Sequence, residues 1–389
     1  GNGYDSANGN AVLYMLNPMT GDIIKKIVAD NPYVDSGNGL SSPIAVDVNA
    51  DEKVDFVYAG DLKGNMWKFD LTGPNANQWG VAYNDGAHDQ PLFKAEGPYG
   101  SEQAITSKPE VMLHPDNHGL MVLFGTGKFL GNSDFTDHST QSVYGIWDYG
   151  DRVYYPGEWG DYSNDDDQEY LGTFTRDHLS NQPQNVTLLK QTSDPYTVFV
   201  NGENDSPVEI NLRVMSSDQP IWKTRYDNDT KGKPDFPDLS DIGTSHAGWY
   251  YDLPLVGERI INDLQLRDGR LAASCFRPGP DRCSDESNSF LMELNAFTGG
   301  GIPGAIFDLN EDGVIDAADT VITGYDAENN PIRVPPAGIK MPGNLQPPVS
   351  LRLNHRVAMN YLSSSTGTVH MLKSPAVKLG VIYWKELEQ

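Results

Sequence analysis

Short apolar segments recur along the chain, and turn-forming residues bound nearly every one of them. Residues 11–27 hold two apolar stretches that are separated by a turn containing Gly21. Residues 56–73 repeat this arrangement around Gly64, and residues 290–299 end in the same kind of turn. Short runs rich in Val, Ile, Tyr, Trp and Phe between Gly, Pro, Asn and Asp indicate strands joined by tight turns. The pattern predicts an all-β protein in which each unit is a strand, a turn and a second strand.

Weaker copies of this unit occur at residues 119–127, 142–148 and 361–372. Several such units at irregular intervals indicate the blades of a β-propeller, in which each small sheet buries its faces against its neighbours. A β-sandwich is the structural alternative. We therefore expect residues 1–389 to form a single modified β-propeller domain.

The segment from about residue 148 to 245 has a different composition, rich in Asp, Asn, Ser and Gln. It still carries strand-like pieces at residues 187–190 and 196–200. We interpret it as a region of long, decorated loops within or between blades, because acidic runs of this kind usually form a solvated surface.

The composition excludes some classes of binding partner but says less about the fold. The 389 residues carry a formal net charge of −26, which argues against nucleic acid and anionic membrane as partners. No stretch approaches the ~20 apolar residues of a membrane span. The chain starts at Gly1 without an initiator Met. We expect it to be a C-terminal fragment of a larger precursor, so its targeting information would lie elsewhere.

The chain contains two cysteines, Cys275 and Cys283, on either side of a loop rich in Pro and Gly. A disulfide between them is the preferred interpretation, since calcium loops of modest affinity suit an extracellular protein. Two free thiols in the cytosol are the alternative. A zinc site is not expected, because no further metal-ligand residues accompany the pair.

An acidic stretch of twelve residues, 308–319, has the spacing of a calcium-binding loop. Such a loop takes side-chain oxygens from positions 1, 3, 5 and 9, a backbone carbonyl from position 7, and a glycine at position 6 for the sharp turn. Gly313 occupies position 6. The expected ligands are Asp308, Asn310, Asp312, the Val314 carbonyl and Asp316, and, with less support, Asp319 at position 12.

A second acidic loop lies at residues 47–55, between two apolar runs whose strands it would join as a hairpin. It is less orthodox, since position 6 is Glu52 and position 12 would be Tyr58. The expected ligands are Asp47, Asn49, Asp51, the Lys53 carbonyl and Asp55. Residues 227–235 resemble a damaged third copy, in which Lys231 takes the place of a carboxylate, and no ion is expected there.

Signals for catalysis are thin. His114 and His118 flank a turn that contains Pro115, and we expect a solvated turn there, since a helix is needed to bring histidines of this spacing together on a metal. Residues 125–128 lack most of a phosphate-binding loop, and no Gly-x-Ser-x-Gly motif occurs.

Five segments of the chain are distinctive: residues 57–71, 248–254, 257–259, 289–300 and 383–387. The first directly follows the acidic loop at residues 47–55, and the five are spread over most of the chain outside the region from about 148 to 241. In sequence and in order, these segments resemble the C-terminal domain of PilY-type type IV pilus proteins.

The resemblance implies a seven-bladed, modified β-propeller distantly similar to quinoprotein dehydrogenases. It also implies a regulatory calcium loop at Asp308, Asn310, Asp312, Val314 and Asp316 that controls pilus extension and retraction, and a role in adhesion at the pilus tip. The integrin-binding Arg-Gly-Asp reported for the family is absent, and residues 267–269 hold only a scrambled triplet.

These observations favour a calcium-binding, non-enzymatic pilus biogenesis factor and adhesin with links to twitching motility and virulence. Its expected partners are pilus subunits or minor pilins and a surface receptor, protein or glycan. Its expected place is the cell surface and pilus of a Gram-negative bacterium, reached through the periplasm and outer membrane. Two alternatives stay open: a quinone-dependent dehydrogenase on the same architecture, and a structural propeller that calcium merely stabilises.

Overall fold

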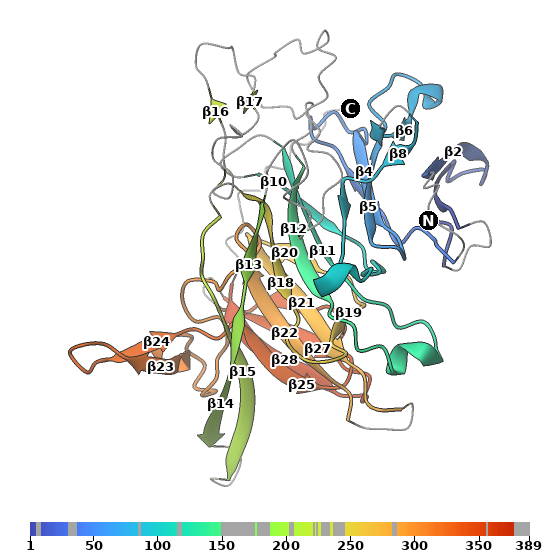
Figure 1. The fold of residues 1–389 in the computed structure, drawn as a ribbon. Coiled ribbons are helices and arrows are strands. Elements are labelled where there is room, and N and C mark those ends of the chain that lie inside the picture. The colour runs from blue at the N-terminus through green and yellow to red at the C-terminus, as the bar shows by residue number, and fades with distance from the viewer. Residues whose placement is uncertain are drawn as a thin grey trace, which may run out of the picture.

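The computed structural model describes residues 1–4, 9–29, 37–84, 87–114, 119–148, 176, 187–201, 206–220, 222, 225–226, 234–235, 246–281, 286–354 and 357–376. Over these residues the regular structure consists of β-strands and 3₁₀ turns of three or four residues, which confirms the all-β prediction (Figure 1). The turns are η1 (Ala76–Gln78), η2 (Pro98–Gly100), η3 (Asn132–Phe135) and η6 (Ala317–Asp319).

The first half of the chain forms hairpins where the apolar pattern predicts them. Strands β1 (Ala11–Leu16) and β2 (Ile23–Ala29) pair antiparallel. A five-stranded sheet follows, in which β4 pairs with β3 and β5, and β5 also pairs with β6 and β9. Its strands are β3 (Ile44–Val46), β4 (Phe56–Gly60), β5 (Asn65–Asp70), β6 (Gly80–Val81) and β9 (Phe93–Lys94). Because Ile44 pairs with Tyr58, the loop at residues 47–55 closes the β3–β4 hairpin, as predicted.

A second five-stranded sheet has the order β10-β11-β12-β18-β13. Its strands are β10 (Glu110–Leu113), β11 (Leu120–Gly125), β12 (Ser142–Asp148), β18 (His246–Asp252) and β13 (Thr187–Gln191). β13 runs parallel to β18, whereas the other pairs are antiparallel. Both β11 and β12 are buried along their whole length, which explains their continuous apolar sequence.

The largest sheet has the order β14-β15-β25-β22-β21-β19, with β20 paired to β21. Its strands are β14 (Ser193–Asn201), β15 (Pro207–Met215), β25 (Gly338–Pro342), β22 (Asn288–Asn295), β21 (Arg270–Arg277), β19 (Arg259–Ile260) and β20 (Gln265–Arg267). The scrambled triplet forms the β20–β21 turn, where Asp268 and Gly269 both have positive φ. That conformation suits a two-residue hairpin turn.

Smaller sheets complete the described structure. The β23–β24 hairpin stands away from the large sheets in Figure 1. A three-stranded sheet, β26-β27-β28, lies near the end of the described chain. The strands of these sheets are β7 (Tyr83–Asn84), β8 (Asp89–Gln90), β16 (Arg225–Tyr226), β17 (Pro234–Asp235), β23 (Val321–Tyr325), β24 (Pro331–Val334), β26 (Val349–Arg352), β27 (Val357–Ser363) and β28 (Val369–Pro375).

One apolar core joins the three larger sheets, because buried residues of all three belong to the same cluster. Trp249 on β18 is fully buried and lies directly across from Gly145 on β12. A Cβ at position 145 would lie 2.4 Å from the indole, so only glycine leaves room for this ring. Separate sheets that share one apolar core are typical of neighbouring blades.

Two sequence predictions need correction. Residues 290–299 do not start a hairpin, since no strand follows β22 until β23 at Val321. The glycines at 299–301 and Pro303 interrupt strand pairing, and β22 pairs instead with β21 and β25. His114 is not a solvated histidine: it is 4% exposed, and its ring packs against Trp147, Trp222 and Phe297.

Two strands in the region expected to be loops are confirmed, and they belong to the main sheets. β13 joins the second five-stranded sheet, and β14 with β15 forms one side of the largest. Most other residues of that region lie outside the described residues, as do His118 and the segments at 227–233 and 383–387.

Two buried ionic contacts tie distant strands together. Lys68 on β5 pairs with Asp148 on β12 at 2.8 Å, and the hydroxyls of Tyr58 and Tyr83 also donate to that carboxylate. Arg213 on β15 forms two hydrogen bonds with Glu258, at 2.7 and 2.8 Å, and both side chains are almost fully buried.

Candidate calcium loops

The loop at residues 308–319 is anchored in an apolar cluster on the large sheet. Ile306, Phe307 and Leu309 are 2%, 1% and 6% exposed, and they pack with residues of β15, β22 and β25. Asp308 lies between Phe307 and Leu309, and the other acidic residues of the loop follow Leu309. The local sequence therefore fixes the start of the loop in the core and turns most of its oxygens toward the surface.

Inside this loop, the side chains at positions 1, 3 and 5 bend the backbone around themselves. Asp308 Oδ2 accepts the Gly313 N–H at 3.1 Å. Asn310 Oδ1 accepts the Asp312 N–H at 3.0 Å, and Asp312 Oδ1 accepts the Val314 N–H at 2.7 Å. Gly313 has a φ of 87°, which explains the glycine at position 6.

Asp319 closes the loop. Its Oδ1 accepts the N–H groups of Leu309 and Asn310 at 2.8 and 3.3 Å, and its Oδ2 accepts that of Asp316 at 3.0 Å. The residue is fully buried. Asp316 is exposed and caps η6, with Oδ1 accepting the Ala318 N–H at 2.7 Å. Asp319 therefore holds the two ends of the loop together, whereas Asp316 keeps an oxygen at the surface.

One oxygen atom of the loop is a candidate contact for a cation. Asp308 Oδ1 is buried and has no hydrogen-bond partner, although Oδ2 of the same carboxylate has two donors. Leaving a charged oxygen buried without a partner is costly, and a hard cation such as Ca²⁺ would satisfy it. In the described part of the chain, no three Asp, Glu, His or Cys side chains lie together as a metal-binding group.

The loop at residues 47–55 has the same internal geometry. Asp47 Oδ2 accepts the Glu52 N–H at 2.8 Å, Asn49 Oδ1 accepts the Asp51 N–H at 2.8 Å, and Asp51 Oδ1 accepts the Lys53 N–H at 3.0 Å. Positions 4 and 6 have positive φ in both loops. They are Ala50 and Glu52 here, with φ of 59° and 68°, and Glu311 and Gly313 in the later loop, with φ of 58° and 87°. Glu52 thus adopts a conformation that favours glycine.

Asp55 takes the place in this loop that Asp319 takes in the other. Its Oδ2 accepts the Val48 N–H at 2.8 Å, at the same position in the loop as Leu309. Asp55 is 7% exposed, and burial raises its pKa above the usual range of aspartate. The Lys53 ammonium lies on Asp51 at 3.0 Å on the exposed side. The shorter loop therefore closes three residues earlier with the same kind of bond.

The structure adds a residue that the local spacing could not indicate. The Lys373 ammonium on β28 lies 3.1 Å from Asp308 Oδ2, although the two residues are 65 positions apart. Cys275 on β21 is buried, and burial raises the pKa of its thiol. Cys283 lies outside the described residues, so its pairing with Cys275 stays a prediction.

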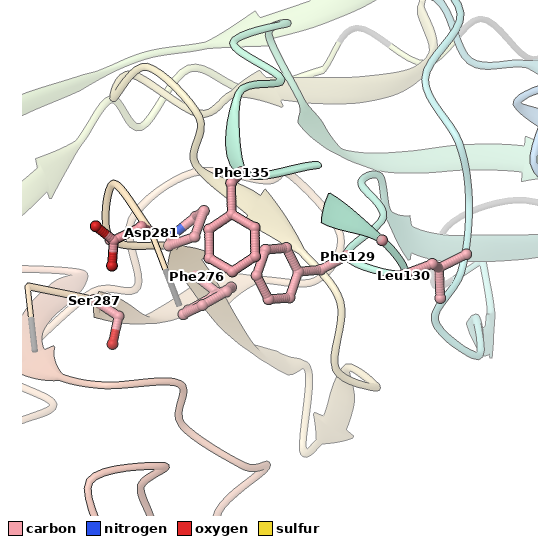
Figure 2. A pocket seen from close by; sticks show the side chains of 9 residues that line it. Phe129, Leu130, Phe135, Phe276, Asp281 and Ser287 are labelled. Carbon is pink, nitrogen blue, oxygen red and sulfur yellow. The ribbon is translucent and has the colours of Figure 1, made fainter. Parts of the chain in front are cut away.

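A separate pocket of about 360 Å³ lies beside β21 and η3 (Figure 2). Three phenyl rings gather at it, with the centroid of Phe129 lying 4.9 Å from that of Phe135 and 5.4 Å from that of Phe276. Asp281 and Ser287 also line it. None of its lining residues belongs to either acidic loop.

Among the described residues, no helix is long and apolar enough to cross a bilayer.

Comparison with known proteins agrees with this architecture. Residues 1–155 match the family model of the PilY1 β-propeller domain. The type IV pilus biogenesis factor PilY1 of Pseudomonas aeruginosa is 30% identical over 335 residues, which cover 82% of this chain and 25% of that protein. A PilY1 homologue of Xylella fastidiosa is 30% identical over 321 residues, covering 79% of this chain and 18% of its own length. The chain thus spans a quarter or less of these relatives.

A solved structure is similar over nearly the whole chain. The crystal structure of the Pseudomonas aeruginosa PilY1 C-terminal domain has a TM-score of 0.67 and 25% identity, and the match covers 96% of this chain and 68% of that one. These similarities confirm the predicted β-propeller, while its seven blades stay a prediction. By sequence and by fold, the chain is a relative of the C-terminal β-propeller domain of PilY1-type pilus biogenesis factors.

Proposed function

We propose that the chain is a calcium-binding, non-enzymatic module of a type IV pilus biogenesis factor and tip-associated adhesin. The observation that carries the calcium site is Asp308 Oδ1, a buried carboxylate oxygen without a partner in a loop of calcium-ligand spacing. The link to pili is supported by the relatives, which are named type IV pilus biogenesis factors. The ligands would be Asp308, Asn310, Asp312, the Val314 carbonyl and Asp316, with Asp47, Asn49, Asp51, the Lys53 carbonyl and Asp55 in the second loop.

The proposed switch is electrostatic. Residues 308–319 contain five carboxylates, which repel one another when no cation is near. Bound Ca²⁺ supplies the positive charge that draws these oxygens together. Because Asp319 and the core residues already hold the ends of the loop, ordering its middle would affect the entry to η6 and the β23–β24 hairpin. That gives a two-state element which a pilus partner can sense.

The proposed partners are pilus subunits or minor pilins and a surface receptor, and the proposed location is the pilus at the cell surface. Under this proposal, calcium binding to the loop controls pilus extension and retraction, twitching motility and attachment. The charge of −26 suits a basic or calcium-bridged partner surface and opposes nucleic acid.

Calorimetric titration with Ca²⁺ tests the two sites. We expect two binding events in the wild-type chain, one lost in Asp312→Ala and the other in Asp51→Ala. Glu328→Ala removes an exposed carboxylate from the β23–β24 turn and serves as the control. Loss of a single event only in Asp312→Ala would leave the loop at 47–55 as a plain turn. No binding in the wild type would overturn the calcium proposal.

Pilus dynamics test the regulatory part. Asp316→Ala should weaken binding and alter twitching, whereas Asp316→Lys should partly mimic occupancy by placing an ammonium in the loop. Normal extension and retraction in both variants, combined with a calcium-dependent melting temperature, would support a purely structural role for calcium. A bound quinone chromophore in the absorbance spectrum would favour the dehydrogenase alternative instead.

A further inference from the structure

Lys373 lies directly at the loop of residues 308–319. Its ammonium is 3.1 Å from Asp308 Oδ2 and 3.3 Å from the point where a Cβ at Gly313 would lie. The Asp308 side chain is 4% exposed and that of Lys373 is 31% exposed. The ammonium therefore lies over position 6 of the loop, and the lysine side chain stays partly exposed.

No other ion pair reaches this loop in the part of the chain that the structure describes. Lys373 is thus the nearby positive charge that offsets five carboxylates. It occupies one oxygen of Asp308 and leaves Oδ1 of the same carboxylate without a partner. A divalent cation on Oδ1 would therefore lie within a few ångströms of the ammonium, and the two positive charges would repel each other.

We propose that Lys373 is a built-in competing cation, which lowers the calcium affinity of the 308–319 loop and is released when Ca²⁺ binds. This inference rests on the proposed calcium site. The ammonium has two opposite effects at Asp308. It stabilises the calcium-free loop, and its charge destabilises the calcium-bound loop. Because Lys373 belongs to β28, calcium binding would also break this ionic contact between the loop and the β26-β27-β28 sheet.

The affinity test compares variants by calcium calorimetry. Lys373→Met removes the charge, keeps most of the stem, and should raise the affinity about tenfold at low ionic strength. Lys373→Arg keeps the charge and should bind like the wild type. The control, Lys340→Met, removes the charge of an exposed lysine on β25 and lowers the net charge equally.

Ionic strength separates charge competition from a structural role. The difference in affinity between Lys373→Met and the wild type should shrink as salt is added, because salt screens partly exposed charges. Equal or weaker calcium binding by Lys373→Met at low salt would overturn the proposal. A tenfold gain in calcium affinity that does not change with salt concentration would also contradict the proposal, since repacking of side chains rather than charge would then be responsible.

A measurement on the wild-type chain covers the case in which Lys373→Met folds poorly. Amine-reactive labelling, read by mass spectrometry, should modify Lys373 faster with saturating Ca²⁺ than with chelator, while Lys340 should react equally in both. An unchanged rate at Lys373 would refute the release step. If Asp312→Ala and the wild type titrate alike, the calcium site itself fails, which is a different outcome from failure of the competition.

Discussion

Two carboxylates of the loop at residues 308–319 have different roles. Asp316 is exposed and caps a short turn, whereas Asp319 is buried and accepts three backbone N–H groups. Asp319 had less support than Asp316 as a ligand, because the resemblance places the calcium loop at residues 308–316. Residue spacing also says nothing about the amides that hold a loop closed. The burial of Asp319 depends on the core beneath Leu309, which no spacing rule contains.

Asp319→Ala should therefore damage the fold even without calcium. It leaves buried N–H groups without an acceptor, and we expect the free energy of unfolding to fall by about 2–4 kcal/mol. Asp316→Ala removes only a cap and should cost about 1 kcal/mol. Denaturant unfolding in chelator measures both. Equal losses in the two variants would contradict the assignment of Asp319 as the closing residue.

His114 predicts a pH dependence of stability. Burial lowers its pKa from 6.5 to about 3, so the folded state stays neutral at a pH where the unfolded chain takes up a proton. The stability from neutral His114 is present above pH 6.5 and is lost as the pH falls toward 3, by at most about 1.4 kcal/mol per pH unit.

The comparison with His114→Phe isolates this contribution, since carboxylates titrate in both proteins. We expect the difference in unfolding free energy between wild type and variant to shift between pH 6.5 and pH 4.5, measured by denaturant unfolding in chelator. A constant difference across that range would show that His114 does not titrate as its buried position demands.

At the scale of elements, local sequence signals were sufficient to predict hairpins but not to predict which strands pair in the larger sheets. The strands around Gly21, Gly64 and Gly367 formed where turn chemistry and apolar runs agree, and all three glycines have positive φ. The pairing of β15 with β25 joins segments more than a hundred residues apart, and β13 runs parallel to β18. Such partners depend on tertiary packing, so the sequence pattern alone could not provide them.

The pair of Arg213 and Glu258 is one of these long-range contacts. Burial raises the pKa of Glu258, and the two hydrogen bonds from Arg213 oppose that rise. The guanidinium also stacks 3.6 Å from the Phe290 ring centroid. Removing one partner leaves the other charge buried between β15 and the start of β19.

We expect Glu258→Leu alone to lower the free energy of unfolding by about 3–5 kcal/mol. Arg213→Met with Glu258→Leu should recover most of that loss, because apolar side chains can replace a buried ion pair with little cost. Denaturant unfolding of the two single variants and the double variant measures the coupling. Simple additivity of the single effects would argue against the direct pair.

For the whole molecule, the net charge of −26 acts against compactness, because like charges repel more strongly in the folded state. Cations that bind the folded chain offset this. Calcium at 100 times its dissociation constant adds about 2.7 kcal/mol per site.

The melting temperature should therefore rise with Ca²⁺ far more than with the same ionic strength of NaCl. In Asp312→Ala combined with Asp51→Ala, Ca²⁺ should act no better than NaCl. Scanning calorimetry of both proteins in the two salts makes the comparison. A full calcium response in the double variant would place the ions elsewhere.

The contact between Asp308 and Lys373 has a consequence for the order of events during synthesis. A ribosome produces residue 373 after residue 308, so the acidic loop emerges before the ammonium that offsets it. Until the last strands arrive, the growing chain holds an acidic loop whose negative charge Lys373 does not yet offset. A cation that reaches the loop at that stage would meet no competing ammonium from Lys373, and the arrival of this lysine would then lower the proposed affinity.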